Sequence, residues 1–210
     1  MANLHIKNLI KKYASYTVLQ FEEWKITDGA YWIKGGNGTG KTTLFKIIAG
    51  QTPFIGEVML NSILLHQNPV DYRSLISYAE AEPQYPTFIT GNELLNYHLK
   101  VRKTDRTIAD NLTEQFKMGN FMNNKIGQYS SGMLKKLSLI CAFTGNMELY
   151  ILDEPLITID TESANVLYQY IENRRKEGCT LLISSHQEID SKEISLQGVF
   201  QIQNQQIVPF

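Results

Sequence analysis

An α/β fold with a mostly parallel sheet is predicted by three features of the sequence. Short apolar segments typical of buried strands alternate with segments typical of helices, an order that produces parallel sheets. A glycine cluster at 35–40 lies between a predicted strand and a predicted helix. A mainly helical stretch interrupts the alternation. The 210 residues therefore suit one domain with a core lobe, 1–87 and 147–210, and a helical lobe, 88–146.

The first part of the chain is rich in strand patterns. Residues 4–9 and 18–26 alternate as strands, and 30–33 forms a third strand that runs into the glycine cluster. Asn61-Ser62 separates two further apolar segments, 57–60 and 63–65, and is typical of a hairpin turn. We therefore expect an antiparallel β subdomain beside the parallel sheet. A helix is predicted at 41–49, ending at Gly50, and a short strand at 75–79.

The remaining elements follow the helical stretch, whose clearest helix begins near Asn92. Residues 149–152 form a continuous apolar segment typical of a buried strand. An amphipathic helix is predicted over 161–177, closed by Gly178, and a strand over 180–184. The last segment, 199–208, is predicted to be a hairpin that turns near Asn204.

Composition excludes several classes of protein. The net charge of −1 provides no overall attraction to nucleic acid or anionic lipid. The two cysteines, Cys141 and Cys179, are too few for a disulfide framework and are expected to be reduced. The first residues lack the apolar region of a signal peptide, and no apolar run approaches the ~20 residues that span a bilayer. We therefore expect a cytoplasmic chain, and any role at a membrane requires a partner.

The glycine cluster fits the phosphate-binding pattern G-x-x-x-x-G-K-[ST]. It reads Gly35-Gly36-Asn37-Gly38-Thr39-Gly40-Lys41-Thr42, after a strand and before a helix, as that pattern requires. Glycines allow backbone N–H groups to surround phosphate oxygens, and the start of the helix attracts anions. Lys41 is predicted to reach the β- and γ-phosphates, Thr42 to ligate Mg²⁺ and Thr43 to contact the α-phosphate. The alternative is a glycine-rich turn without a ligand.

Two acids end the apolar strand at 149–152. In a P-loop NTPase core this strand lies beside the phosphate site, so Asp153 is predicted to reach Mg²⁺. Glu154 follows directly and is the candidate catalytic base that deprotonates the attacking water. The alternative is a strand that ends in two solvated carboxylates.

The chain resembles the ATP-binding-cassette (ABC) family over nearly its whole length. Tyr129-Ser130-Ser131-Gly132-Met133 is similar to the family signature Leu-Ser-Gly-Gly-Gln, about 20 residues before the acidic strand. Asp153-Glu154-Pro155 resembles the family's Asp-Glu-Pro, and Asp160 occupies the position of its D-loop aspartate. Ser184-Ser185-His186 resembles the histidine switch, and Tyr13 falls where the family keeps an aromatic residue that stacks on adenine.

The resemblance implies an ATPase that uses ATP and Mg²⁺ and acts as a dimer. Ser130 and the N–H groups of Ser131 and Gly132 can cap the start of a helix that binds an anion. In the family this segment, Ser130 to Met133, binds the γ-phosphate of ATP held by a second subunit, a homodimer or a heterodimer. His186 would contact the γ-phosphate and act with Glu154 in catalysis. Considered alone, His186 is a solvated histidine and Tyr13 a partly buried strand residue.

Two departures from the family pattern are present. Ser131 replaces the first signature glycine, and Met133 replaces the final glutamine. Ala81 occupies the position of the Q-loop glutamine, with Glu82 and Gln84 beyond it. Ser131 keeps the backbone N–H but adds a Cβ near the phosphate of the second half-site, and the sequence identifies no side chain that replaces the Q-loop glutamine.

The resemblance favours the ATP-binding subunit of a transporter whose transmembrane permease is a separate protein. Such a subunit lies on the inner face of the cell membrane and has no nucleic-acid partner. The alternatives are a soluble ABC-type ATPase and a regulatory subunit that hydrolyses ATP slowly. The sequence ends soon after the final hairpin, without the extension of some importer ATPases, which favours an exporter-type or other compact system.

The same resemblance implies a groove that receives a short helix of the permease. It would be formed by residues 81–90 and the helix near Asn92. Tyr85 and Phe88 are the rigid aromatic residues of this stretch, a type enriched in interfaces. The alternative is that such residues anchor the helical lobe to the core.

Overall fold

The computed structural model describes residues 3–186 and 193–210. The chain divides into two compact units. The first contains Met1–Tyr78, Met147–Glu154 and Ile171–Phe210, and the second contains Ala79–Asn146 and Pro155–Tyr170. The predicted helical lobe, 88–146, lies within the second unit. That unit starts earlier, at Ala79, and also includes 155–170.

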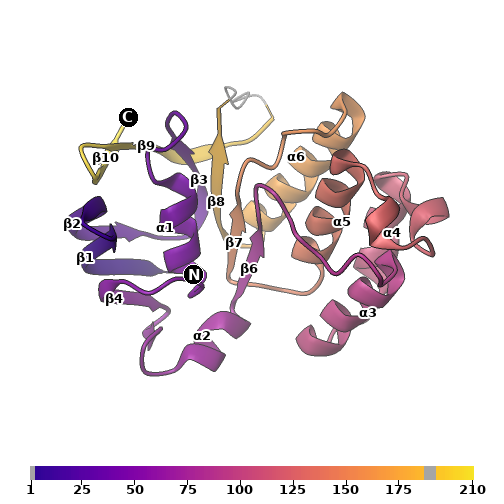
Figure 1. The fold of residues 1–210 in the computed structure, drawn as a ribbon, viewed down its shortest axis with the longest axis horizontal. Helices are drawn as coiled ribbons and strands as arrows, with labels where there is room; N and C mark the ends of the chain where they lie inside the picture. Colours follow the sequence, from indigo (N-terminus) through magenta and orange to yellow (C-terminus); the bar gives the residue numbers. More distant parts are fainter. Residues whose placement is uncertain (1–2, 187–192) are drawn as a thin grey trace. The chain divides into compact units, whose positions relative to one another are not determined.

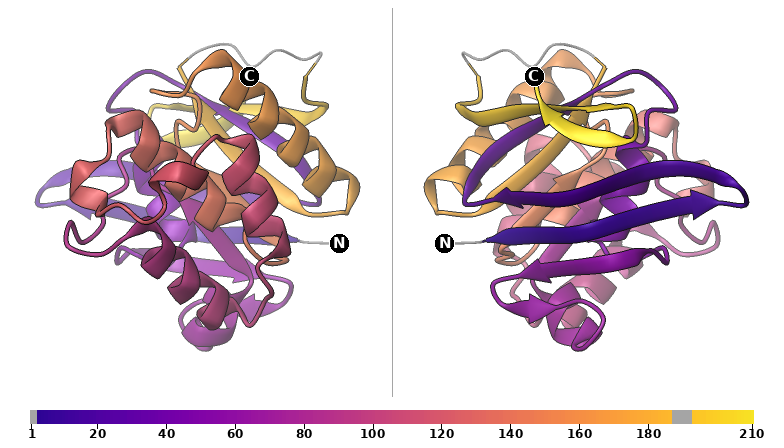
Figure 2. Two further views of the ribbon diagram at one scale, coloured as in Figure 1. Left: turned by 90° about the vertical axis from the view of Figure 1, so that its right-hand side faces the viewer. Right: turned by 90° about the vertical axis from the view of Figure 1, so that its left-hand side faces the viewer.

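The first unit contains a four-stranded antiparallel sheet in the order β2-β1-β4-β5. The strands β1 and β2 are long and run side by side (Figure 2). The predicted hairpin turn at Asn61-Ser62 is present, with φ of 49° and 68°, the left-handed conformation of a two-residue turn. The strands are β1 Leu4–Tyr13, β2 Tyr16–Ile26, β4 Ile55–Leu60 and β5 Ile63–Leu64.

The second sheet has six strands in the order β10-β9-β3-β8-β7-β6 (Figure 1). Its centre is parallel, because β3 pairs in parallel with β8 and β9, and β7 pairs in parallel with β8. The predicted final hairpin is the antiparallel pair β9 and β10. The strands are β3 Gly29–Lys34, β6 Ile76–Ala79, β7 Leu149–Leu152, β8 Thr180–Ser185, β9 Leu196–Gln203 and β10 Gln206–Pro209.

Helix α1, Lys41–Ile48, joins the two sheets through one hydrophobic core. Its Leu44, Phe45, Ile47 and Ile48 are fully buried among side chains from both sheets. The strands β3, β7 and β8 are buried almost throughout, as continuous apolar strands at the centre of a parallel sheet should be. This core holds the carboxyl ends of β3, β7 and β8, where the predicted catalytic residues lie.

The sequence did not predict helix α2, Pro69–Ser74, which has only six residues and no apolar periodicity. Its proline is at the start of the helix, where the missing N–H has no intrahelical acceptor. No helix in the described residues combines the length and hydrophobicity that crossing a membrane requires.

The second unit consists mainly of helices. Thr90 and Glu93 form a capping box at the start of the first, close to the start predicted near Asn92. The Arg102 guanidinium at its other end donates hydrogen bonds to the carbonyl oxygens of Cys141 and Thr144. The helices are α3 Gly91–Arg102, α4 Thr107–Gln115 and α5 Ser131–Phe143, with two short 3₁₀ helices at Gly119–Phe121 and Ile126–Gln128.

Helix α6, Thr161–Lys176, explains why the second unit includes residues after the acidic strand. The residues of α6 up to Tyr170 belong to this unit. The Tyr170 and Phe143 rings lie 5.8 Å apart, and Lys117 Nζ forms an ion pair of 2.6 Å with Glu162 Oε2. These contacts cannot be seen in the linear pattern, so the sequence placed the boundary of the lobe at 146.

Candidate active site

The P-loop runs from the end of β3 into α1 and requires glycine at particular positions. Gly38 and Gly40 have φ of 78° and 108°, values that side chains rarely allow. A Cβ built on Gly36 or Gly38 meets no atom within 4 Å, so the loop borders open space there. A Cβ on Gly40 would lie 3.1 Å from Val18 of β2, which shows how closely the loop packs on that strand.

This loop has the features of an anion site. Gly40 is the N-cap of α1 and has no side chain to satisfy the first N–H groups of the helix. Thr39 stabilises the loop, because its hydroxyl donates to Gly36 O at 3.0 Å. Asn37 and Thr42 are exposed, whereas Thr43 is half-buried. The residues present therefore fit a phosphate chain, because the start of α1 has no side-chain cap and the loop before it borders open space.

Lys41 is the cation of this loop and is 6% exposed. Its ammonium donates to Gly35 O at 2.6 Å and to Gly36 O at 3.0 Å. The same Nζ lies 3.6 Å from Glu154 Oε1. The loop carbonyls and the acid therefore hold the buried positive charge beside the glycines.

Asp153 and Glu154 follow β7 and are both buried. The two oxygens of Asp153 accept hydrogen bonds from hydroxyls, Ser184 Oγ at 2.6 Å and Tyr78 OH at 3.3 Å. Glu154 has φ of 47°, a conformation that is uncommon for a residue with a side chain and that concentrates at functional sites. The predicted alternative, a strand that ends in solvated acids, is wrong because both carboxylates are enclosed.

Glu154 Oε1 is one of two buried side-chain polar atoms in the described residues that have no hydrogen-bond partner; Trp24 Nε1 is the other. Lys41 Nζ and His186 Nε2 approach Oε1, the latter at 3.1 Å, but neither has hydrogen-bond geometry. Oε2 accepts a hydrogen bond from His186 N at 3.1 Å. One carboxylate oxygen is thus free to accept a proton from a bound water.

The first unit therefore brings together Lys41, Asp153, Glu154 and His186. Tyr13 belongs to the same unit and lies at the end of β1, with a ring that is 50% exposed. Lys11 Nζ lies 4.4 Å from the centre of that ring. No group of three or more His, Cys, Asp or Glu that could hold a metal occurs in residues 3–186 and 193–210.

The signature segment lies in the second unit. Ser130 is the N-cap of α5 and accepts a hydrogen bond from Met133 N at 3.2 Å, as its predicted capping role requires. Ser131 is exposed, so its extra side chain meets no packed surface. A Cβ on Gly132 would lie 2.6 Å from Thr158 O, so the second signature glycine is required by packing.

A substitution at Gly132 tests this difference between the two signature positions. Gly132→Ala is expected to lower the Tm by several degrees, because the added Cβ displaces a backbone carbonyl at an overpacked contact. Ser131→Ala, the adjacent control, should leave the Tm nearly unchanged. Thermal unfolding followed by circular dichroism measures both, and equal Tm values in the two variants would contradict the packing argument.

Asp160 lies directly before helix α6, in the second unit. Lys136 Nζ lies 2.7 Å from its Oδ2, and Ser163 N donates to its Oδ1 at 2.8 Å. These two contacts, Lys136 first, hold the pKa of the Asp160 carboxyl well below its usual range. Asp160 is therefore charged at neutral pH, and its ion pair with Lys136 connects the start of α6 to α5, the helix that begins in the signature segment.

Some residues at these sites carry no motif signal. Lys135 is buried, and its ammonium donates to Glu80 O at 2.8 Å and to Ala81 O at 2.6 Å. The backbone at the Q-loop position is thus held by the signature helix, although Ala81 has no polar side chain. Tyr78 also lies outside the motifs, and its hydroxyl donates to Asp153. Ser184 belongs to the segment that resembles the histidine switch, but its contact with Asp153 becomes visible only when the strand pairing is known.

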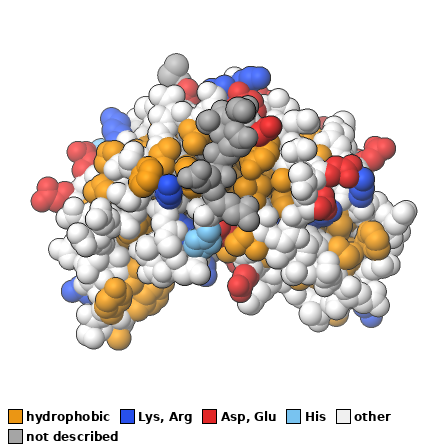
Figure 3. Space-filling view, turned by 90° about the horizontal axis from the view of Figure 1, so that it is seen from above, with side chains coloured by type: hydrophobic (Ala, Val, Ile, Leu, Met, Phe, Trp, Pro, Cys, Tyr) orange, Lys and Arg blue, Asp and Glu red, His pale blue; other side chains and the backbone are white. Residues whose placement is uncertain are grey.

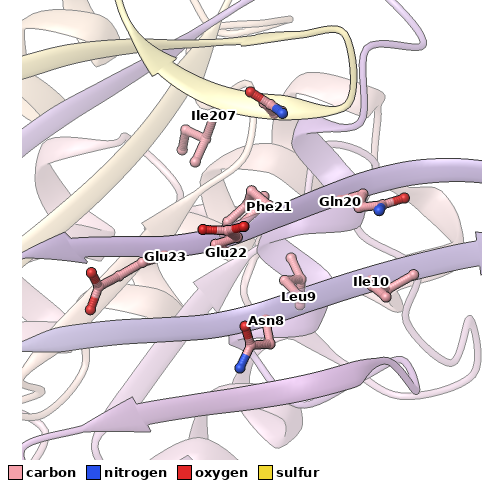
Figure 4. A pocket seen from close by; sticks show the side chains of 9 residues that line it. Asn8, Leu9, Ile10, Gln20, Phe21, Glu22, Glu23 and Ile207 are labelled. Carbon is pink, nitrogen blue, oxygen red and sulfur yellow. The ribbon is translucent and has the colours of Figure 1, made fainter.

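A groove of about 550 Å³ also lies in the first unit, between β10 and the strands β1 and β2 (Figure 4). Asn8, Gln20, Glu23 and Ile207 are among its lining residues. None of the P-loop residues lines it. We therefore assign the candidate active site to the region of Lys41 and Glu154, because of the chemistry of these residues, and not to this groove.

Known proteins match the chain in sequence and in fold. The family model described as ABC transporter matches residues 23–157. The cytochrome c biogenesis ATP-binding export protein CcmA of Histophilus somni is 32% identical, over 77% of this chain and 76% of that protein. The lantibiotic transport ATP-binding protein SrtF of Streptococcus pyogenes is 29% identical, over 87% of this chain and 80% of that protein.

A solved structure described as the ATP binding subunit of an ABC transporter has the same fold. Its TM-score is 0.87 at 22% identity, and the match covers 99% of this chain and 90% of that one. The predicted P-loop NTPase core, with its antiparallel subdomain and inserted helices, is thereby confirmed. The chain belongs to the ABC transporter family, as an ATP-binding and ATP-hydrolysing member.

Proposed function

We propose that this chain hydrolyses ATP to drive substrate movement through a separate transmembrane permease, on the inner face of the cell membrane. The observation that carries the proposal is the buried Glu154 carboxylate, with one free oxygen, beside the P-loop lysine. Relatives named as export and transport ATP-binding proteins support the coupling to transport.

The proposed roles at the first-unit site follow from its chemistry. The N–H groups of residues 35–40 and the Lys41 ammonium bind the phosphates, and Thr43 contacts the α-phosphate. The Thr42 hydroxyl and the Asp153 carboxylate are hard oxygen ligands that would hold Mg²⁺, which commonly binds one or two carboxylates together with phosphates. Mg²⁺ neutralises developing phosphate charge when bound. Glu154 takes a proton from the attacking water, and His186 contacts the γ-phosphate.

The second-unit residues would act on a second copy or a related subunit. Ser130, Ser131, Gly132 and Met133 would bind the γ-phosphate of ATP on the opposite subunit at the start of α5, where the Ser130 hydroxyl already accepts a hydrogen bond from Met133 N. Asp160 would support the same interface from the start of α6. The exposure of Ser131 is compatible with this role, because its backbone N–H remains available.

The Tyr13 ring is proposed to stack on adenine. Tyr13→Ala should weaken ATP binding by about 1–3 kcal/mol, the range for one base stacked on an aromatic ring. Tyr13→Phe should be nearly silent because it keeps the ring. Calorimetric titration with ATP measures both variants. An equal loss in both would mean that the hydroxyl, and not the ring, makes the contact.

Residues 81–90 and α3 are proposed to receive the permease, and the structure separates the two aromatic candidates there. Phe88 is 74% exposed, and exposed Tyr97 and Val101 lie on α3. Tyr85 is half-buried, burial raises the pKa of its phenol, and its hydroxyl bonds to Ser138. Hydrophobic side chains also reach the surface on the face seen in Figure 3, among polar and charged groups.

Two alanine variants test the coupling to a permease. The tagged chain is expected to co-purify with a multi-span membrane protein from detergent-solubilised membranes of its own cells. Phe88→Ala should reduce that recovery while the Tm and ATP affinity stay unchanged. Tyr85→Ala, the matched control, should lower the Tm because its ring is packed within the second unit. If no membrane protein is recovered and membranes leave the ATPase rate unchanged, the transporter function is wrong.

A further inference from the structure

Ser184 is a buried strand residue that contacts both acids of the active site. It is fully buried near the end of β8. The parallel pairing ends with Leu152 beside Ile183, so the register places Ser184 next to Asp153. Its Oγ lies 2.6 Å from Asp153 Oδ1 and 2.9 Å from Glu154 N.

The direction of both hydrogen bonds follows from the chemistry of the groups. An ionised carboxylate only accepts hydrogen bonds, and a backbone N–H only donates them. The single Ser184 hydroxyl proton therefore points to Asp153, and an oxygen lone pair accepts the Glu154 N–H. The Ser184 hydroxyl therefore has both a donor and an acceptor partner, and it gives a hydrogen bond to the Asp153 carboxylate and accepts one from the Glu154 N–H in a place that is closed to solvent.

The bond to Glu154 matters because the backbone of that residue is in an uncommon conformation. Its φ of 47° persists only when neighbouring contacts support it. The Ser184 hydroxyl fixes its N–H, and His186 N fixes its Oε2 at 3.1 Å. Together these two bonds hold the carboxylate so that Oε1 is free and lies 3.6 Å from Lys41 Nζ.

We propose that Ser184 is a positioning residue that orients both acids, aiming the Asp153 carboxylate and fixing the Glu154 backbone. The inference rests on the proposed roles of Asp153 as a metal ligand and Glu154 as the base. Tyr78 OH contacts the other oxygen of Asp153, at 3.3 Å. Removal of the Tyr78 hydroxyl should therefore affect Asp153 without affecting the Glu154 backbone. The effect on the Asp153 carboxylate can thus be measured separately from the effect on the Glu154 backbone.

The test compares Ser184→Ala with two other variants that remove a buried hydroxyl. Thr180→Val is the control, because Thr180 is equally buried on β8 but donates to Thr27 O. Tyr78→Phe removes the second donor to Asp153. The readouts are hydrogen exchange of the ¹⁵N-labelled Glu154 amide, Mn²⁺ affinity of the ATP complex by electron paramagnetic resonance, and kcat and KM for ATP.

Ser184→Ala is expected to speed exchange of the Glu154 amide and to weaken Mn²⁺ binding and kcat by about tenfold each, as loss of a hydrogen bond to a charged group predicts. KM for ATP should stay within about twofold, because the phosphate donors are untouched. Tyr78→Phe should weaken Mn²⁺ binding and leave the amide protected. Thr180→Val should match the wild type in every readout.

Wild-type amide protection and Mn²⁺ affinity in Ser184→Ala would overturn the inference while leaving the proposed function intact. Absence of ATP hydrolysis by the wild-type chain would instead overturn the proposed function, and wild-type hydrolysis in Glu154→Gln would overturn the proposed role of Glu154 as the base. If Ser184→Ala does not fold, Ser184→Cys keeps the size of the side chain with a weaker donor. It should show the same changes to a smaller extent, and wild-type values in that variant would likewise overturn the inference.

Discussion

Replacing Glu154 with glutamine is expected to reduce ATP hydrolysis by about 100-fold or more, because general-base catalysis contributes on that order. Glutamine keeps the shape of the side chain but cannot accept a proton from water. Binding of ATP should persist, since the P-loop donors and Lys41 are unchanged. The phosphate-release rate and a calorimetric titration with ATP together measure this separation of chemistry from binding.

The matched control for this variant is Glu148→Gln, the same chemical change just before the other end of β7. Glu148 is outside the site, and its backbone N–H is bound to Leu75 O at 2.9 Å. It should hydrolyse at the wild-type rate. ATP should also accumulate a dimer of Glu154→Gln that light scattering detects, because a trapped nucleotide holds the two subunits together. Wild-type hydrolysis by Glu154→Gln would show that another group is the base.

Lys41→Ala is expected to lower ATP affinity at least tenfold, because charge-assisted contacts contribute about 1.5–3 kcal/mol each. The substitution removes the ammonium that is buried beside Glu154 and that bonds to Gly35 O and Gly36 O. It therefore removes the cation that is proposed to bind the phosphates, and it also removes the two hydrogen bonds that stabilise the loop. Calorimetry gives the affinity, and the Tm reports the structural part of the loss.

Lys46→Ala is the control, since Lys46 lies in the last turn of the same helix, α1. It should bind ATP as the wild type does. A Lys41→Ala variant with wild-type ATP affinity would contradict the P-loop assignment. If the Tm of that variant were also lower, Lys41 would support the structure of the loop without binding phosphate.

Most of the fold was predictable because its elements have strong local signals. The strand at 149–152 and the helix at 41–49 are confirmed within a residue or two, since continuous apolar segments and a following glycine mark them clearly. The helix α2 escaped prediction because six residues carry too little periodicity. The unit boundary also differed, because packing of Tyr170 on Phe143 joins segments that are distant in sequence.

The candidate nucleotide site could be predicted from the sequence, because its proposed chemistry depends on residue types at short, fixed spacings. Lys41 and Thr42 must follow the glycines, and Glu154 must follow Asp153, whatever surrounds them. The sequence could not indicate that Ser131 tolerates a side chain while Gly132 does not, because the decisive neighbour, Thr158 O, comes from another segment.

Tertiary structure alone decided how the acids are held. Hydrogen bonds between Ser184, Tyr78 and Asp153 depend on which strands are neighbours and in which register they pair. Burial likewise separated Tyr85 from Phe88, which look equivalent as aromatic residues in one loop. Side-chain contacts between distant segments arise only when the chain folds, so no local pattern in the sequence encodes them.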